Sequence, residues 1–178
     1  RDRMISIAFH GPAYSDVKID KAALDLLART SFSSSSPLFQ KLVIEEQKCL
    51  NLNASFSDNR DPYLLLFNAT LKDEKDLPYV EDEIFKELER LKKEPVPEDV
   101  LADVKSNLKY SFADELGTTD GVAGLLVGYI NLTTDPETVN RLFDLYERVT
   151  SGDIQEMAKK YFNKTNSTVA TLTGGKSK

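Results

Sequence analysis

The sequence predicts an α+β domain in which several helices pack on one face of a mainly antiparallel sheet of about four strands. Three observations carry this prediction. A β-rich segment opens the chain, a pair of strand-like segments follows two short helical segments, and a long helical stretch separates that pair from one closing strand. Strands and helices therefore do not alternate along the chain as they do in a parallel α/β sheet.

The chain begins with a strand and a helix. Residues 3–9 are rich in β-forming residues and stop at the breaker pair Gly11-Pro12. Asp20 is the expected cap of a helix. The apolar positions of that helix follow the spacing of a buried stripe, namely Ala23, Leu24, Leu27 and Ala28.

A second helix and a hairpin follow. Ser36 and Pro37 have the order of a cap and a first helical turn, which predicts a helix over residues 37–47. The next segment alternates, with one side expected to face the core (Leu50, Leu52, Ala54, Phe56) and the other to face water or a cavity (Asn51, Asn53, Ser55). Residues 63–71 are apolar on both faces at first, which places this return strand near the middle of the sheet. The turn over residues 58–62 ends at Pro62.

The second half of the chain is mainly helical. Pro95 and Pro97 separate two amphipathic helices. The first is expected to bury Val80, Ile84, Leu88 and Leu91, and the second to bury Val100, Val104, Leu108 and Phe112. A third helix, residues 120–131, carries Gly121, Gly124 and Gly128, a spacing that indicates close helix packing. A fourth starts at Asp135-Pro136 and is expected to bury Val139, Leu142, Phe143, Tyr146 and Val149. A capping box at residues 150–153 opens a fifth helix that ends near residue 163, residues 167–173 form the last strand, and residues 174–178 are a frayed tail.

Length and charge limit the possible functions. The 178 residues, 40% of them hydrophobic, fit one domain over residues 1–178, which we interpret as a fragment of a larger multi-domain protein. The net charge of −6 argues against a nucleic-acid partner, which needs a concentrated positive face. The longest apolar run, residues 122–130, is interrupted by glycines and is too short for a membrane span.

No catalytic, cofactor-binding or metal-ligating residue is assigned within this chain. His10 is the single histidine, so the chain cannot supply the two histidines of a helical H-x-x-E-H zinc motif, and a nucleophilic triad has no other base. Cys49 is the single cysteine and is expected to be a buried thiol. The chain offers too many carboxylates for any one pair to be informative, and Glu45 and Glu46 are expected on an exposed helix edge.

The segment LVIEEQKCLNLNASFSDNRDPYLLLFNATLK, residues 42–72, resembles the second half-domain of the pitrilysin/insulinase family of zinc metallopeptidases. The segments IAFHGPAYSD, KEPVPEDVLADVKSNL and VTSGDIQEMAKKYF extend the resemblance from Met4 to about Leu172. It implies a half-domain with helices on one face of an antiparallel sheet. Two such half-domains form a lobe, and two lobes enclose a chamber in which peptides are cleaved at a zinc ion held by another half-domain.

Some family members carry an arginine and a tyrosine, seven residues apart, that assist substrate binding from this half-domain. The matching positions here are Val43 and Leu50, which have no side-chain hydrogen-bond donor. This departure indicates the C-terminal half of the zinc-bearing lobe itself. A degenerate, non-catalytic subunit is the other possibility.

The leading hypothesis is a non-catalytic, cleft-forming C-terminal half-domain of a bacterial zinc metallopeptidase, with zinc expected in the N-terminal half-domain. The alternatives are an inactive scaffold or peptide-binding relative and an unrelated α+β domain. The expected partners are other half-domains or a homologous subunit, and a peptide that could add to a sheet edge near Asn51, Asn53 and Ser55. The resemblance also indicates a periplasmic or secreted location.

Overall fold

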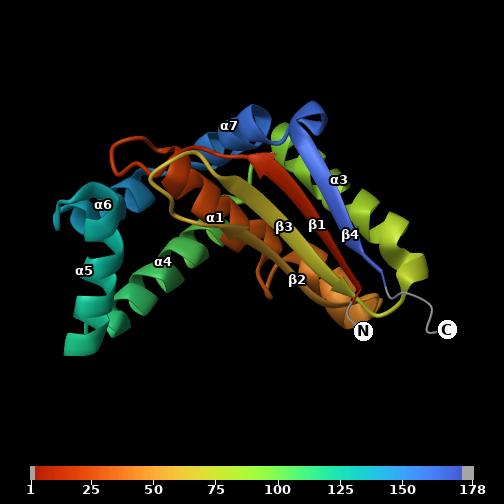
Figure 1. Ribbon diagram of the computed structural model, residues 1–178, viewed down its shortest axis with the longest axis horizontal. Coiled ribbons are helices and arrows are strands. Elements are labelled where there is room, and N and C mark those ends of the chain that lie inside the picture. The colour runs from red at the N-terminus through yellow and green to blue at the C-terminus, as the bar shows by residue number, and fades with distance from the viewer. Residues whose placement is uncertain (1–2, 174–178) are drawn as a thin grey trace.

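The computed structural model describes residues 3–173, so the predicted tail at 174–178 lies outside the described part of the chain. Its centre is an antiparallel sheet in the order β2-β3-β1-β4 (Figure 1). The strands are β1 (Arg3–His10), β2 (Cys49–Phe56), β3 (Leu64–Leu71) and β4 (Ser167–Leu172). β3 lies inside the sheet, as its two apolar faces predict, and the predicted fold class is confirmed.

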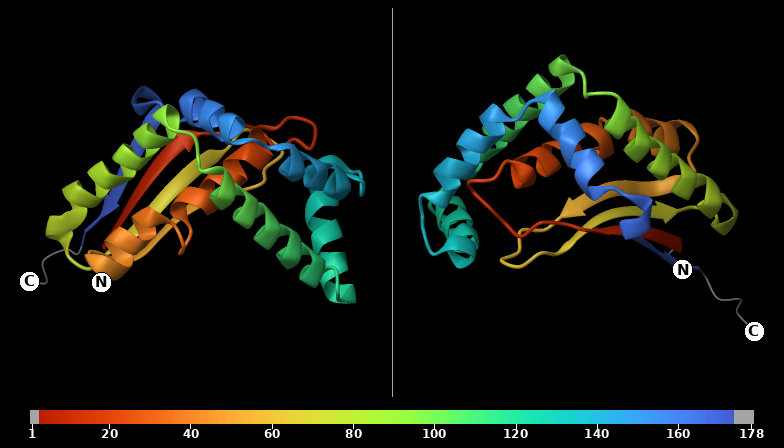
Figure 2. Two further views of the ribbon diagram at one scale, coloured as in Figure 1. Left: turned by 180° about the vertical axis from the view of Figure 1, so that it is seen from behind. Right: turned by 90° about the horizontal axis from the view of Figure 1, so that it is seen from above.

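Helices α1 (Asp20–Phe32), α3 (Leu77–Lys93) and α7 (Ser151–Tyr161) cover one face of the sheet (Figure 2). All four residues predicted to face inward from α3, from Val80 to Leu91, are buried. No helix in the described residues covers the opposite face, where Asn51, Asn53 and Ser55 are exposed as predicted. Helices therefore occupy one side of this sheet only.

Aromatic rings join the sheet to its helices. The Phe67 ring centroid of β3 lies 4.6 Å from that of Phe32 in α1, 5.9 Å from that of Phe9 in β1, and 5.1 Å from that of Phe162, which follows α7. All four side chains are buried. The core thus forms between segments far apart in the sequence, which fixes the first helix and the last helix on the same sheet.

The start of α1 differs from the prediction. Asp20 is the first helical residue and makes no capping bond, since the N-cap position is Ile19. The Asp20 carboxylate instead accepts hydrogen bonds from Lys160 Nζ and Tyr161 Oη of α7, each at 2.6 Å. A contact between two helices replaces the local cap.

The second predicted helix is shorter and changes type. Ser36 caps α2 (Pro37–Phe39) as predicted, and the chain continues as the π-helix η1 (Gln40–Glu45). The widened turn keeps Leu42 buried in the core. Gln47, with a φ of 53°, takes the left-handed conformation and lies beyond the helix that was expected to include it.

A β-bulge at the start of β2 overturns the predicted side for Leu50. Cys49 pairs with Leu71 and Asn51 with Thr70, so Leu50 is the extra residue and is 59% exposed. The bulge shifts the two-residue period by one, and Cys49 faces the core in place of Leu50. Cys49 is thus the buried thiol that the sequence predicts.

Helices α4 (Glu98–Glu115) and α5 (Thr119–Thr133) form an arm that extends away from the sheet (Figure 1). The predicted inner face of α4 holds in part. Leu101 is buried in place of Val100, which is 37% exposed. Val104 and Leu108 are half-buried against the core, and Phe112, farther along the arm, is half-buried.

Helix α6 (Thr138–Arg148) returns from the arm to α7. It buries Val139, Leu142 and Tyr146 as predicted, but Phe143 is half-buried and Leu145 is buried instead. The predicted capping box at Thr150 and Asp153 opens α7. Two short 3-10 turns, η2 (Glu74–Asp76) and η3 (Lys164–Asn166), precede α3 and β4. No helix in the described part is long and apolar enough to cross a membrane.

Candidate functional site

The positions singled out in the sequence do not come together. His10 ends β1 and is exposed, and among residues 3–173 no three His, Cys, Asp or Glu side chains are grouped as metal ligands would be. Burial raises the pKa of the Cys49 thiol to about 11, so this thiol stays protonated near neutral pH. Val43 is half-buried against the core and Leu50 points outward from its bulge.

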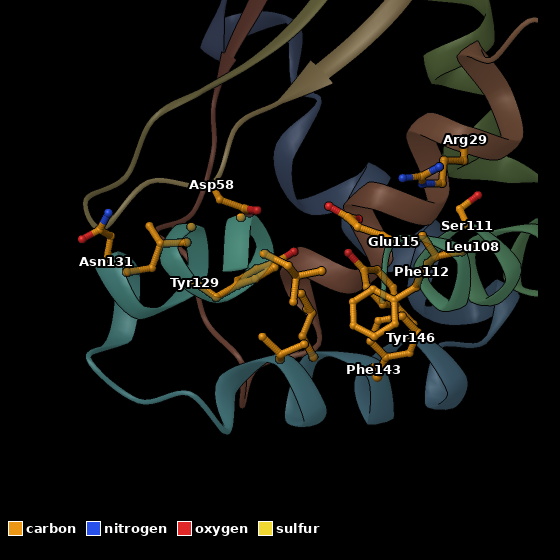
Figure 3. A pocket seen from close by; sticks show the side chains of 16 residues that line it. Arg29, Asp58, Leu108, Ser111, Phe112, Glu115, Tyr129, Asn131, Phe143 and Tyr146 are labelled. Atoms are coloured by element: carbon orange, nitrogen blue, oxygen red, sulfur yellow. The ribbon is translucent and has the colours of Figure 1, made fainter. Parts of the chain in front are cut away.

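The main hollow of the molecule is a cleft of about 640 Å³ at the elbow between α4, α5 and α6 (Figure 3). Its walls are apolar and come from all three helices: Leu108, Phe112, Leu125, Leu132, Leu142 and Phe143. The ring centroids of Phe112 and Phe143 lie 3.7 Å apart. The cleft therefore offers an apolar, partly aromatic interior that the elbow of the arm creates.

Polar residues also line the cleft. They are Arg29 of α1, Asp58 of the β2–β3 loop, Ser111 and Glu115 of α4, Tyr129 and Asn131 of α5, and Tyr146 of α6. A second hollow of about 450 Å³ is also lined by Arg29, Asp58, Tyr129 and Tyr146, so the two hollows adjoin at these four side chains. We refer to the two together as the elbow cleft.

A buried cation lies at the floor of the elbow cleft. Lys21, only 7% exposed, places its Nζ 2.5 Å from Asp25 Oδ1 and 2.9 Å from Asp58 Oδ1, and donates to the Phe56 carbonyl at 2.9 Å. Burial acts to lower the pKa of Lys21, but the two carboxylates outweigh it and raise this pKa. Lys21 therefore remains charged, with its ammonium group bound to the two carboxylates and the Phe56 carbonyl.

Tyr146 completes this network. Its hydroxyl donates to Asp25 Oδ2 at 2.6 Å. Burial and the Asp25 carboxylate both raise the pKa of Tyr146, which keeps its hydroxyl protonated as a donor. The network joins α1, α6 and the β2–β3 loop, and it holds no nucleophile beside a free base.

Two of the three glycines of α5 lie on the wall of the elbow cleft. Apart from the backbone of its own helix, a Cβ atom at Gly124 or Gly128 would meet no described atom within 4 Å, whereas one at Gly121 would lie 2.0 Å from the Glu115 carbonyl. Close packing, predicted for all three, holds at Gly121 only. The glycine spacing is the sequence signal on α5. Other lining residues belong to the apolar stripes predicted for α4 and α6, namely Leu108, Phe112, Leu142, Phe143 and Tyr146.

A family model described as "Peptidase M16 inactive domain" matches residues 2–108. The chain is 26% identical over 171 residues to the zinc protease PqqE of Helicobacter pylori, an alignment that covers 94% of this chain and 37% of that protein. The chain therefore spans well under half the length of this relative.

Solved structures show the same fold. A protease from Helicobacter pylori superposes with a TM-score of 0.88 at 24% identity, over 97% of this chain and 41% of that one. An inactive peptidase domain from Bordetella parapertussis superposes with a TM-score of 0.83 at 21% identity, over 97% of this chain and 93% of that one. Because the family model spans more than half of its residues, the chain belongs to the peptidase M16 inactive domain family.

Proposed function

We propose that this chain is the non-catalytic, cleft-forming half of a zinc-dependent peptidase, in which a zinc site in another half-domain hydrolyses the peptide bond. The observation that carries the proposal is its membership in a family of inactive peptidase domains. The match to 37% of a zinc protease supports it, since more than half of that relative lies outside the matched segment. Residues 1–178 then form one domain of a larger protein.

The surface of the arm supports a partner half-domain or homologous subunit. Large apolar side chains are exposed on α4 and α5: Tyr110 at 74%, Val127 at 61% and Ile130 at 37%. Helix α5 carries no charged residue after Asp120, and a helix that is apolar on all sides is normally covered. A second protein surface over the outer face of α5 would remove Val127 and Ile130 from water.

The test is peptide cleavage by this chain mixed with the neighbouring half that carries an H-x-x-E-H motif. A quenched fluorescent peptide library is added with and without a chelator. We expect cleavage by the mixture only, and loss of cleavage when the chelator is present. Elemental analysis of the isolated chain should find no stoichiometric zinc, and one tightly held zinc per chain contradicts the proposal.

The second candidate is an inactive scaffold that binds peptides. The pair Val43 and Leu50, which lacks the donors that some family members place here, is compatible with this scaffold as well as with the first proposal. A folded complex that binds peptide but cleaves none, with zinc supplied, would support this scaffold. Chelator-sensitive cleavage would exclude it.

A further inference from the structure

We propose that the elbow cleft is a peptide-binding subsite. It takes one large apolar side chain of an extended peptide, whose main chain lies across Arg29 and Glu115 on the rim. This inference rests on the proposed function, because it supplies a peptide contact for the non-catalytic half. It concerns the hollow between α4, α5 and α6, which adjoins the end of β2 through the second hollow.

Two glycines leave the cleft wall of α5 without side chains. Gly124 and Gly128 lie one helical turn apart on the cleft wall, and the space beside each is open. Glycine is among the poorest helix formers, and nothing in the described chain requires it at either position. These glycines leave room for a group that is not part of the chain.

The interior defines the chemistry of that group. Leucine, phenylalanine and valine side chains of α4, α5 and α6 form the apolar part of the lining, and the volume of about 640 Å³ has room for a large side chain with its flanking main chain. The close rings of Phe112 and Phe143 offer an aromatic surface to an incoming ring. Apolar and aromatic side chains are therefore favoured over charged ones.

The rim adds a donor and an acceptor. Within residues 3–173, neither Arg29 nor Glu115 takes part in an ion pair or a side-chain hydrogen bond, whereas Lys21 beneath them is fully engaged. Figure 3 shows both side chains at the same rim of the cleft. A peptide main chain presents a carbonyl acceptor and an amide donor, which complement Arg29 and Glu115, respectively. The opposite charges of these two residues favour a neutral segment.

A protein partner would use a different surface. The outer face of α5, which includes Ala123 and Val127, is exposed and does not line the cleft. Substitutions on the two faces of α5 can therefore distinguish binding of a peptide in the cleft from binding of a protein partner that covers the arm.

The experiment titrates the 178-residue chain, without zinc, into a fluorescein-labelled peptide and follows its anisotropy. The probe is a short alanine-serine peptide with blocked ends and one central phenylalanine. Peptides with serine or glutamate at that position serve as controls. We expect the phenylalanine peptide to bind saturably. Both control peptides should bind more weakly than it by about tenfold or more, which is the effect of burying one aromatic side chain.

Gly128→Leu places a side chain inside the cleft, and Ala123→Leu adds the same side chain to the outer face of the same helix. The open space at Gly128 allows this substitution without disturbing the fold, which circular dichroism and the melting temperature will verify. We expect Gly128→Leu to weaken binding about tenfold or more and Ala123→Leu to change it by less than about twofold. Arg29→Gln should weaken binding by roughly threefold to tenfold through loss of a rim hydrogen bond.

Three results would overturn the inference: no saturable binding, equal binding of the phenylalanine and serine peptides, or unchanged binding by a folded Gly128→Leu variant. A loss with Ala123→Leu equal to that with Gly128→Leu would also overturn it, in favour of the outer face. Chelator-sensitive cleavage alongside any of these results leaves the proposed function in place. Peptide binding without cleavage contradicts the proposed function alone.

Discussion

Lys21 is the residue on which the floor of the elbow cleft depends. Its ammonium group joins Asp25 of α1 to Asp58 and the Phe56 carbonyl of the β2–β3 connection. Charges this well buried are stable only while paired, since each lost its hydration on folding. Lys21 therefore positions a loop that forms one side of the cleft.

Replacing Lys21 by Met should destabilise the fold by about 3 kcal/mol, because Asp25 is left buried with Tyr146 as its remaining partner. Adding Asp25→Leu to this variant should recover most of the loss. Urea unfolding of the single and double variants measures both effects. Lys75→Met, at the exposed ion pair with Asp73, is the control and should leave the midpoint unchanged.

Asp20 makes stability depend on acid pH. Burial alone would raise its pKa, but hydrogen bonds from Lys160 and Tyr161 outweigh burial and lower it below the ordinary value. At a pH between the folded and unfolded pKa values of Asp20, the unfolded chain binds more protons than the folded chain. The stability that Asp20 contributes is therefore fully present above the unfolded pKa of about 3.9, and it is lost as the pH falls through the folded pKa.

Asp20→Asn should therefore lower stability near neutral pH by roughly 1–2 kcal/mol and reduce the loss of stability on acidification. Urea unfolding as a function of pH, compared with the parent chain, measures both. An unchanged acid dependence would contradict this role for Asp20.

At the scale of elements, α5 departs most from an ordinary surface helix. It lacks charge after its first turn, carries glycines on the cleft wall, and exposes apolar side chains on its outer face. Periodicity correctly predicts that this helix exists. It does not predict that both of its faces lie outside the core.

Alanine substitutions should separate the three glycines of α5. Gly124→Ala and Gly128→Ala should each raise the free energy of unfolding by about 0.5–1 kcal/mol, because a methyl group fits there and alanine favours the helix. Gly121→Ala should lower it, because the new methyl group would meet the Glu115 carbonyl. Urea unfolding of the three variants checks the opposite signs.

At the scale of the whole molecule, the core and the arm differ in how they are held. The core buries aromatic rings between the sheet and its helices, whereas α5 keeps Leu125 as its buried residue. An element with few buried apolar side chains opens more readily than the core it extends from. The arm is the part of this domain that gains most from a partner.

Hydrogen exchange should show this difference directly. We expect the amides of α5 to exchange faster than those of α1 in the isolated chain, and to slow when the neighbouring half-domain is added. Unchanged exchange of α5 in a confirmed complex would place the partner on another surface. Adding peptide to the complex also tests the sequence-based prediction that it pairs with residues 51–55, whose amides should then slow as well.

Local spacing along the chain predicts the fold class and most helix and strand positions, as in the inward residues of α3 and the capping box of Thr150 and Asp153. The family follows from the resemblance of residues 42–72 and three further segments. The sequence also placed Cys49 in the core and Asn51, Asn53 and Ser55 in water. Such features follow from neighbours along one element, which the sequence states directly.

The points at which helices and strands leave the core depend on tertiary packing, which the sequence pattern does not contain. The bulge at Leu50 arises from pairing with β3, and the exposure of Val100 arises because α4 departs from the sheet. The elbow cleft is formed by side chains that belong to different elements, such as Arg29 and Glu115, and no motif relates such positions. Periodicity reports which side of a helix is apolar, but the packing of distant segments decides whether that side meets the core, water or a cleft.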